Sequence, residues 1–337
     1  MKVAFFELEP WEKQRILGSG WKDGEVLFFE EPLTEKLLPK LREATVLSPF
    51  IYSPVTRQTL EALPNVKLVT TRSTGYDHID LKAASERGVT VSNVPTYGEN
   101  TVAEHAFGLL LALSRNIHRA YVRSLNHDFR IEGLKGLDLE DKTLGIVGGG
   151  RIGLHMARIA HGFRMRILVH DRRMDMFLEK LIGYKYVDFD QLLTESDVLS
   201  LHIPLVPATK HLINRETIAK MKKGAILINT ARGGLVDTEA LLEALDQEKL
   251  RGAGLDVLDH EELLKEEDQR IGADSKQRSS HDQRLLKVTE RLMKREDVIF
   301  TPHIAFYSQE ALQRIVDTTL LNIREWSKGN PINVVRT

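Results

Sequence analysis

The stretch Thr143-Leu-Gly-Ile-Val-Gly-Gly-Gly-Arg-Ile-Gly153 decides the fold of the second half of the chain. An apolar run ends in glycines, and a helix-like segment follows. Gly148, Gly150 and Gly153 fit the pattern G-x-G-x-x-G: the first glycine allows a tight turn, the second a close approach to a pyrophosphate, and the third close packing of helix on sheet. The N–H groups at the start of such a helix hold phosphate charge. The stretch therefore predicts the phosphate-binding turn of a dinucleotide-binding domain.

A second apolar run, Met165-Arg-Ile-Leu-Val-His170, ends in Asp171. An acid about 20 residues after the glycines accepts hydrogen bonds from the ribose hydroxyls of NAD and repels the 2′-phosphate of NADP. We therefore predict NAD as the cofactor. Arg172 and Arg173 leave an alternative open, because a guanidinium beside Asp171 could bind a 2′-phosphate. They could equally be residues of a solvated loop.

The composition bounds the class of protein. A chain of 337 residues, 42% hydrophobic and 28% charged, predicts a soluble globular protein of two domains. Its net charge of −1 gives no electrostatic reason to expect nucleic acid or membrane as a partner. The absence of cysteine excludes disulfides, thiolate catalysis and Cys–metal sites. With no signal peptide and no apolar run long enough for a membrane span, we expect a cytoplasmic protein.

Strand-like runs alternate with helix-like segments, which predicts an α/β protein with parallel sheets covered by helices. The strands expected in the first half are 3–6, 25–29, 45–49, 66–71 and 89–92, with helices at 34–41, 56–63 and 81–87. Those expected in the second half are 143–147, 166–170, 184–187, 198–202, 225–229, 252–257 and 298–301, with helices starting at Arg151, Asp188, Asn214 and Asp237.

Three further segments bear on the organisation. A long helix is expected over Asn100–His118, capped by Asn100; it is either a connector or dimer contact, or a buried core helix. Charged residues dominate Asp259–Asp297, which predicts an insertion, helical near Leu285–Met293 and mobile around Gly272–Ser280. The tail Tyr307–Trp326 has a helical apolar pattern, and by folding back it would make the first domain discontinuous.

Candidate chemistry lies at the expected carboxyl ends of strands, the edge at which open α/β sheets bind ligands. Arg232, in the turn Asn229-Thr-Ala-Arg-Gly-Gly234, has the planar fork that grips a carboxylate, although a surface arginine before a helix is the alternative. His303 follows the last strand, and histidine as a residue type suits a proton donor because its reference pKa lies near neutrality, although a lone histidine is more often structural. Asp256 and Glu261 follow the strand before it and could be only helix caps. A carboxylate near His303 would favour the imidazolium. No histidine spacing demands a metal, and none is expected.

Taken together, the motifs resemble those of the D-isomer-specific 2-hydroxyacid dehydrogenases, most closely their D-lactate dehydrogenase branch. The resemblance covers most of the chain and is carried by Arg72–Asp80, Asn93–Tyr97, Val102–His105, Gly148–Gly153, Asn229–Gly233, Gly254–Val257 and Thr301–Tyr307. It implies two Rossmann-like domains: a flavodoxin-like substrate (catalytic) domain, 1–100 plus 305–337, and an NAD-binding domain, 101–304, with the charged insertion near 259–297. It also implies a homodimer through the helix near Thr101–Arg119.

The resemblance implies roles as well. Arg232 would bind the substrate carboxylate and polarise the keto oxygen, His303 would be the general acid/base, and Glu261 would pair with it. Spacing favours Glu261 over Glu262 for that pairing. The substrate would contact the Thr74–Gly75 backbone, Tyr97 and, less directly supported, Tyr52. The cofactor would contact Gly148, Gly150, Arg151, Ile152, Gly153, Asp171, His202, Pro204, Thr230, Ala231 and Asp256.

These expectations amount to the reversible reduction of a small 2-keto acid such as pyruvate by NADH. Tyr97 and the Phe306–Tyr307 pair lean toward lactate as the product. Reduction of glyoxylate or hydroxypyruvate is the alternative within the same chemistry. An NAD-sensing binding protein, like the co-repressors that share this fold, is the alternative of a different class. The presence of Arg232, Glu261 and His303 argues against it.

Overall fold

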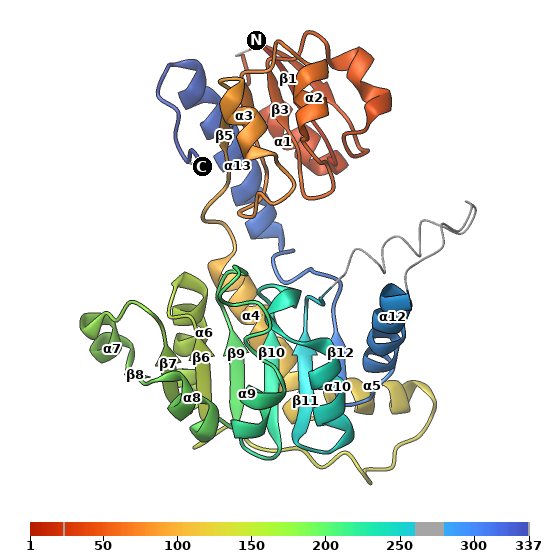
Figure 1. Ribbon diagram of the computed structural model, residues 1–337, viewed down its shortest axis with the longest axis vertical. Coiled ribbons are helices and arrows are strands. Elements are labelled where there is room, and N and C mark those ends of the chain that lie inside the picture. The colour runs from red at the N-terminus through yellow and green to blue at the C-terminus, as the bar shows by residue number, and fades with distance from the viewer. Residues whose placement is uncertain (23, 260–279, 336–337) are drawn as a thin grey trace. The chain divides into compact units, whose positions relative to one another are not determined.

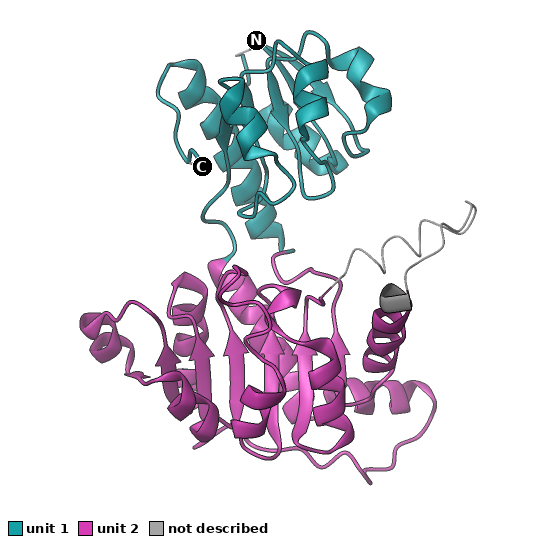
Figure 2. Cartoon of the chain, in the orientation of Figure 1, with its two compact units in different colours: residues 1–98, 307–337 teal, residues 99–306 magenta. Residues whose placement is uncertain are grey.

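The computed structural model describes residues 1–22, 24–259 and 280–335. These residues form two compact units, which Figure 2 shows in different colours. Unit 1 consists of Met1–Gly98 and Tyr307–Thr337, and unit 2 of Glu99–Phe306. Each unit has one parallel β-sheet with helices packed on it (Figure 1). The predicted fold class, α/β with two Rossmann-like parallel sheets and a discontinuous first domain, is confirmed.

The sheet of unit 1 has five parallel strands in the order β2-β1-β3-β4-β5, which is the flavodoxin-like order. Its strands are β1 (Lys2–Phe5), β2 (Glu25–Phe28), β3 (Val46–Ser48), β4 (Leu68–Thr70) and β5 (Thr90–Ser92). Its helices are α1 (Pro10–Gly18), the 3-10 helix η1 (Glu35–Leu41), α2 (Arg57–Ala62), α3 (Leu81–Glu86) and α13 (Gln309–Ser327). All five predicted strands are found, with small differences at their ends.

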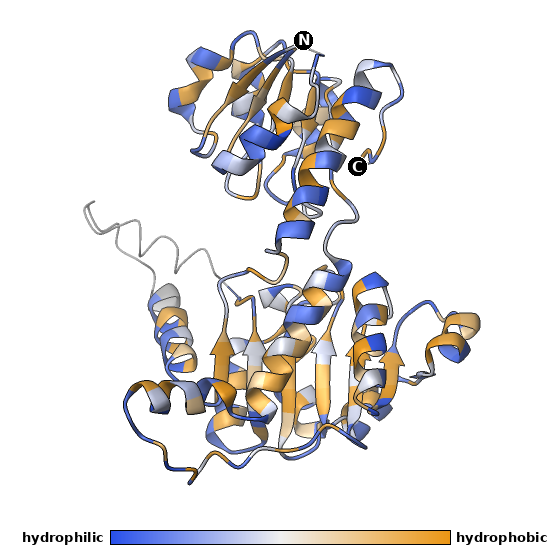
Figure 3. Cartoon of the chain, turned by 180° about the vertical axis from the view of Figure 1, so that it is seen from behind, coloured by the Kyte–Doolittle hydropathy of each residue, from blue (hydrophilic) through white to orange (hydrophobic). Residues whose placement is uncertain are grey.

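Alternation along β1 builds the two apolar layers of unit 1. Val3 and Phe5 pack in the cluster that includes Val316, Leu320 and Ile323 of α13. Ala4 and Phe6 belong to the opposite cluster, which η1, α2 and α3 complete. Since successive side chains of a strand point to opposite faces, a strand covered on both faces is apolar throughout, as this one is. Figure 3 shows this hydrophobic character in the strands of both sheets.

The sheet of unit 2 has seven parallel strands in the order β12-β11-β10-β9-β6-β7-β8. They are β6 (Thr143–Val147), β7 (Arg166–His170), β8 (Lys185–Tyr186), β9 (Val198–Leu201), β10 (Ala225–Asn229), β11 (Leu250–Leu255) and β12 (Val298–Phe300). This is the doubly wound dinucleotide-binding order extended by one strand, and the strand order reverses between β6 and β9. Dinucleotides bind at the carboxyl edge beside that reversal.

Helices cover both faces of the second sheet. They are α4 (Glu99–Ser114), α5 (Ile117–Leu125), α6 (Arg151–Gly162), α7 (Met176–Ile182), α8 (Phe189–Glu195), α9 (Arg215–Lys220), the 3-10 helix η2 (Gly233–Leu235), α10 (Thr238–Asp246) and α12 (Ser280–Met293). The predicted helix starts at Asp188, Asn214 and Asp237 are N-caps, and each side chain accepts a backbone N–H from the first turn. Within the charged insertion, α12 packs on α10 and buries Leu286 and Leu292. The segment expected to be mobile, 272–280, lies outside the described residues except for the start of α12.

Several predicted elements were wrong in detail. The single helix expected over Asn100–His118 is two helices, because Asn116 adopts a left-handed φ of 51° between α4 and α5. Asn100 lies inside α4 and does not cap it. The helix at 34–41 is a 3-10 helix that contains Pro39. The tail helix starts at Gln309, not at Tyr307. Helices α1, α5 and α7 were not predicted.

A buried ion pair lies at the carboxyl edge of the unit 1 sheet. The guanidinium of Arg72 is 1% exposed and its Nη1 donates to Oε1 of Glu12 at 2.5 Å. Its Nη2 donates to the carbonyls of Phe6 and Glu7. Burial raises the pKa of Glu12 and lowers that of Arg72, although each partner opposes the shift of the other. The pair therefore joins the carboxyl ends of β1 and β4 to α1.

Removing one partner of this pair should be costly. We expect Glu12→Ala to lower the free energy of unfolding of unit 1 by about 3–5 kcal/mol, because a buried guanidinium loses its counter-charge. Urea unfolding measures this change. The control is Asp317→Ala, which removes an ion pair to Arg15 that is exposed on both sides and should cost less than about 1 kcal/mol. Equal losses in the two variants would contradict the prediction.

Candidate active site

The glycine turn between β6 and α6 has the predicted geometry. Gly148 has a φ of +100°, and a Cβ on it would lie 2.5 Å from the carbonyl oxygen of His202. A Cβ on Gly153 would lie 2.0 Å from the carbonyl oxygen of Gly148, so α6 packs on the turn only because residue 153 is glycine. Around Gly150, the N-cap of α6, a Cβ would meet nothing within 4 Å. That open space at a helix N-terminus suits a pyrophosphate.

The Asp171 carboxylate lies against this turn at the end of β7. Its Oδ2 accepts the N–H of Gly149 at 2.7 Å and its Oδ1 accepts the N–H of Arg173 at 2.9 Å. The two backbone donors fix the orientation of the carboxylate, and its remaining lone pairs suit ribose hydroxyls. The side chains of Arg172 and Arg173 are exposed.

Two more polar groups mark the ends of β9 and β10. The Nε2 of His202 is 2.9 Å from the hydroxyl of Ser200, and burial lowers the pKa of His202 to about 4, so its ring is neutral at pH 7. The hydroxyl of Thr230 is buried and has no hydrogen-bond partner in the part of the chain that is described. A buried hydroxyl without a partner is costly, and a bound ligand would satisfy it. The residues present thus fit a bound dinucleotide.

Arg232 lies in a tightly packed turn after β10. The side chain of Asn229 accepts the N–H of Ala231 and donates to the carbonyl of Arg232. A Cβ on Gly233 would lie 2.0 Å from the carbonyl carbon of Leu258, so the turn rests directly on the chain that follows β11. The half-buried guanidinium donates from Nη1 to the carbonyl of Ala231 at 2.7 Å.

His303 lies in a strained turn after β12. Its φ of +55° is in the left-handed region that a non-glycine residue rarely adopts. The Asp256 carboxylate, which is fully buried, holds this turn. It accepts the hydroxyl of Thr301 at 2.6 Å and the N–H groups of Ile304 and Ala305 at 2.9 and 2.8 Å. The Asp256 carboxylate therefore fixes the backbone conformation around His303.

The sheet brings several predicted residues to one edge. Arg232, Asp256 and His303 follow the adjacent parallel strands β10, β11 and β12. Neighbouring strands lie about 5 Å apart, so the strands that precede Arg232 and His303 are about 10 Å apart. Glu261, and with it the choice between Glu261 and Glu262, lies outside the described residues.

Unit 1 holds the Thr74–Gly75 turn after β4 by side-chain hydrogen bonds. The hydroxyl of Ser73 donates to the carbonyl of Gly75 at 2.6 Å, and Asn93 Nδ2 donates to the carbonyl of Thr74 at 2.8 Å. The hydroxyl of Thr74 donates to the carbonyl of Val94 at 2.8 Å. Among the described residues, the N–H groups of Thr74 and Gly75 have no acceptor. Successive backbone N–H groups without an acceptor in a turn are able to bind an anion.

The aromatic residues of unit 1 are placed as follows. Tyr52 is 52% exposed, and its N–H donates to Oε2 of Glu7 at 3.0 Å. Tyr97 is half-buried, and its carbonyl accepts from Nε of Arg314 at 2.6 Å. The hydroxyl of Tyr307 donates to the carboxylate of Glu9, which raises the pKa of Tyr307 to about 12 and keeps it protonated.

Sequence reasoning missed two residues near these turns. The carboxylate of Glu7 accepts the N–H groups of Phe50 and Tyr52 and the hydroxyl of Ser53, so it orders the turn after β3. His105 on α4 contacts Thr301 and Asp256 beneath the His303 turn. Both contacts join residues far apart in the chain, and no local spacing would have revealed them.

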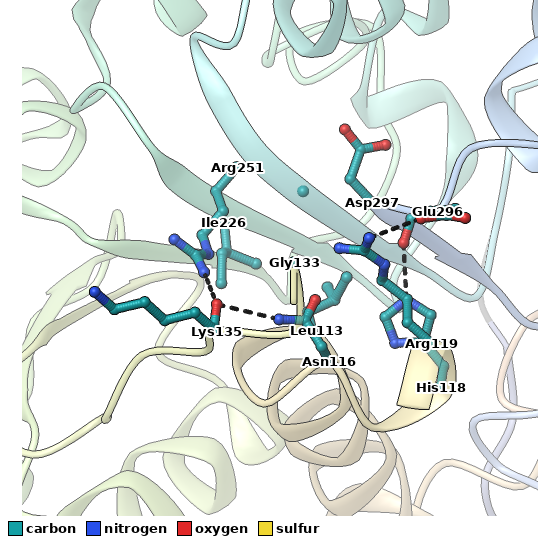
Figure 4. Close-up of a pocket in the computed structure, with 11 residues that line it drawn as sticks. Leu113, Asn116, His118, Arg119, Gly133, Lys135, Ile226, Arg251, Glu296 and Asp297 are labelled. Atoms are coloured by element: carbon teal, nitrogen blue, oxygen red, sulfur yellow. Dashed lines mark hydrogen bonds and ion pairs between the residues drawn. The ribbon is translucent and has the colours of Figure 1, made fainter. Parts of the chain in front are cut away.

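Other features of unit 2 do not belong to this edge. A cavity of about 190 Å³ lies at the opposite edge, near the amino ends of β10 to β12 (Figure 4). Several of its polar groups contact one another: Arg119 pairs with Glu296, and Arg251 and Asn116 donate to the carbonyl of Lys135, while the buried Nε of Arg119 has no partner among the described residues. In the described ranges no cluster of His, Asp and Glu could hold a metal ion. No described helix is both long and apolar enough to span a membrane.

Known proteins resemble this chain along nearly its whole length. The family described as "D-isomer specific 2-hydroxyacid dehydrogenase, NAD binding domain" matches residues 107–305. D-lactate dehydrogenase of Escherichia coli is 38% identical, with 98% of each chain covered. Glyoxylate reductase of Thermococcus litoralis is 37% identical over 99% of this chain and 92% of its own.

A solved structure extends the comparison to the fold. D-lactate dehydrogenase from Aquifex aeolicus, complexed with NAD and lactic acid, superposes with a TM-score of 0.84 at 35% identity, covering 97% of this chain and 96% of that one. The predicted NAD cofactor and the predicted oxidoreductase acting on a CH–OH group are confirmed by these matches. A family match over more than half of the chain, whole-chain relatives and the geometry at the carboxyl edge agree: the chain belongs to the D-isomer-specific 2-hydroxyacid dehydrogenase family.

Proposed function

We propose that the protein is a D-lactate dehydrogenase that interconverts pyruvate and D-lactate. The observation that carries the proposal is the placement of Arg232 and His303 at the same edge of the unit 2 sheet, after strands β10 and β12, which are about two strand spacings apart. A carboxylate clamp and a proton donor at that separation suit a small 2-keto acid. The identity to a named D-lactate dehydrogenase along the whole chain supports the same substrate.

In this mechanism the substrate carboxylate is bound by the guanidinium of Arg232, whose fork matches it bidentately. We assign the N–H groups of Thr74 and Gly75 as further carboxylate donors, and Tyr97 and Tyr52 as residues that line the pocket, as the family resemblance implies. Support for the backbone donors comes from their lack of acceptors among the described residues of unit 1. Arg232 also polarises the keto oxygen, so that negative charge developing there meets a fixed positive group.

His303 holds the proton for the keto oxygen on its imidazolium and takes it back in the reverse reaction. NADH, when bound, would supply the hydride for the keto carbon. Glu261 is the carboxylate that we assign to stabilise the imidazolium, as the family resemblance implies. Asp256 sets the backbone on which His303 is presented.

We assign the two units to the two binding tasks, with unit 2 as the NAD-binding domain and unit 1 as the substrate domain. The Gly148–Gly153 turn with Arg151 and Ile152 would hold the pyrophosphate, and Asp171 the ribose. His202, Pro204, Thr230 and Ala231 follow β9 and β10 at the same edge, where the nicotinamide half would lie. The partnerless hydroxyl of Thr230 supports this placement.

The decisive experiment measures NADH oxidation at 340 nm with pyruvate, hydroxypyruvate, glyoxylate and longer 2-keto acids, followed by chiral analysis of the product. We expect the highest kcat/KM with pyruvate and D-lactate as its only product. A higher kcat/KM with glyoxylate or hydroxypyruvate would replace the proposal by the activity that the Thermococcus relative is named for. L-lactate as product would contradict it outright.

Asp171 should set the cofactor preference. We expect Asp171→Ala to lower the ratio of kcat/KM for NADH over NADPH by about 10- to 100-fold, because loss of the carboxylate removes two ribose hydrogen bonds and the repulsion of the 2′-phosphate. Exposed Arg172 and Arg173 would then favour the phosphate. The matched control is Asp190→Ala, which removes a distant acid paired with Lys220 and should leave the ratio unchanged. A wild-type preference for NADPH would contradict this role of Asp171.

We further propose a homodimer through α5 and the loop after it. The apolar stripe of α4 is buried in unit 2, so α4 itself offers little free surface. By contrast α5 has no buried residue; Ile117, Tyr121 and Leu125 are 54–64% exposed, and Phe129 and Ile131 about 80%. Such a contiguous exposed apolar set is typical of a subunit contact.

Light scattering on a size-exclusion column tests this contact. We expect the wild type to run as a dimer and Tyr121→Glu combined with Leu125→Glu to run as a monomer. The control Leu17→Glu, on the equally exposed apolar residue of α1, should leave the dimer intact. A monomeric wild type, or a dimer that survives the double change, would reject α5 as the contact.

A further inference from the structure

Beneath the His303 turn lies a histidine to which neither the motifs nor the proposed mechanism gives a role. His105 on α4 places its Nε2 3.0 Å from the hydroxyl oxygen of Thr301 and 3.6 Å from Oδ1 of Asp256. It lies 196 residues from Thr301 in the chain, and its side chain is 23% exposed. The contact therefore joins the first helix of unit 2 to the end of its last strand.

The direction of this hydrogen bond follows from its neighbours. The Thr301 hydroxyl has one hydrogen, which it donates to Oδ1 of Asp256 at 2.6 Å. Its oxygen is then an acceptor for His105, so Nε2 of His105 must carry a hydrogen and donate it. The two hydrogen bonds therefore run in one direction, from His105 to Thr301 and from Thr301 to Asp256, and they end on a carboxylate that is 0% exposed. Buried hydrogen-bond chains of this kind are strengthened by the low local dielectric constant.

The same carboxylate carries the strained turn. His303 has a φ of +55°, a conformation that is strained for a residue with a Cβ and persists only where its surroundings impose it. The N–H groups of Ile304 and Ala305 are held by the two oxygens of Asp256, and that of His303 by the Asp256 carbonyl. Rotation of the Asp256 carboxylate would break its hydrogen bonds to the N–H groups of Ile304 and Ala305, and the backbone of His303 could then leave its strained conformation.

We propose that His105 is a positioning residue for the reaction: by donating to Thr301 it locks the Asp256 carboxylate and so fixes the backbone that presents His303. This inference rests on the proposed role of His303 as the acid/base. Helix α4 starts at Glu99 and the turn ends at Phe306, the first and last residues of unit 2. The His105–Thr301 bond thus ties together the two segments through which the chain enters and leaves this unit, and His303 is fixed to unit 2.

The test compares His105→Leu with His105→Gln in the full-length protein. Glutamine places an amide N–H close to the position of Nε2 and can still donate to Thr301, whereas leucine cannot. We expect kcat for pyruvate reduction to fall about 10-fold in His105→Leu, as for loss of one hydrogen bond to a buried network. His105→Gln should recover most of that loss. The KM for NADH and the NADH dissociation constant should stay at wild-type values in both.

A double-mutant cycle isolates the bond. Thr301→Val removes the acceptor, and in that background His105→Leu should cause no further loss of kcat, because the two changes delete the same interaction. His155→Leu is the matched control, a half-buried histidine on the neighbouring helix α6, and should leave kcat unchanged. If His105→Leu fails to fold, Thr301→Val against Thr301→Ser makes the same comparison from the other partner.

Three results would overturn the inference: a kcat for His105→Leu within about twofold of wild type, equal losses in the Leu and Gln variants, or additive losses in the cycle. Failure of the proposed function looks different. In that case the wild type would reduce no 2-keto acid, or His303→Ala would retain full activity.

Discussion

Replacing His303 by alanine should lower kcat for pyruvate reduction by about 10³- to 10⁴-fold, the upper range for loss of a general acid. The variant has no group on this turn to protonate the keto oxygen as charge develops. Cofactor binding should be nearly intact, because the Gly148–Gly153 turn and Asp171 lie on other strands of the sheet. Stopped-flow reduction and an NADH fluorescence titration measure the two quantities separately.

Added imidazole offers a check on this interpretation. A small imidazole that enters the vacated space should restore part of the kcat of His303→Ala, with a dependence on pH that follows the added base. The same addition should have no effect on the wild type. Turnover of His303→Ala equal to that of the wild type would remove His303 from its role.

The second large effect is expected for Arg232. Arg232→Gln should lower kcat/KM for pyruvate by roughly 10²- to 10³-fold, or about 3–4 kcal/mol, because a charged pair in a partly desolvated site loses one partner. Arg232→Lys should recover only part of this, since an ammonium group cannot bind a carboxylate bidentately. Steady-state kinetics with pyruvate and with its methyl ester distinguish the causes. The ester should lose much less, because it lacks the charge that Arg232 binds.

Arg251→Gln is the matched control for this prediction. Arg251 lies at the amino end of β11, where it donates to the carbonyl of Lys135 in the cavity of Figure 4. Its loss should leave kcat/KM for pyruvate unchanged. Equal losses for pyruvate and its methyl ester in Arg232→Gln would show that the guanidinium does not bind the carboxylate.

Local chemistry explains which parts of the fold could be predicted from the sequence. The Gly148 turn needs a left-handed residue and the Gly153 position needs close packing, so the glycine pattern carries its own geometry. Asp237 predicts the start of a helix because its carboxylate can accept a backbone N–H of the first turn, as it does in α10. The break at Asn116 was missed, because a single left-handed residue separates α4 from α5 and no glycine or proline marks it in the sequence.

The contacts around the candidate site show where local patterns end. The ends of parallel strands meet at one edge of a sheet, so Arg232 and His303 could be brought together from sequence alone. The hydrogen bonds by which Asp256 holds the His303 turn could not be predicted, because their donors lie 45 to 49 residues away in the chain and reach Asp256 only in the folded protein. Glu12 and Arg72, which form the buried ion pair, are 60 residues apart in the chain, so no local sequence pattern predicts their contact.

The return of α13 to unit 1 has a consequence for biosynthesis. One apolar face of the N-terminal sheet is covered by Val316, Leu320 and Ile323, and the segment after α13 pairs with β5 through Val335 and Val91. Domains normally fold in the order in which the ribosome makes them. Here the N-terminal sheet, although translated first, keeps one hydrophobic face uncovered until α13 emerges from the ribosome. Unit 2 begins later but is complete before α13, so nascent chains stalled at that point would hold a finished unit 2 and an unfinished unit 1.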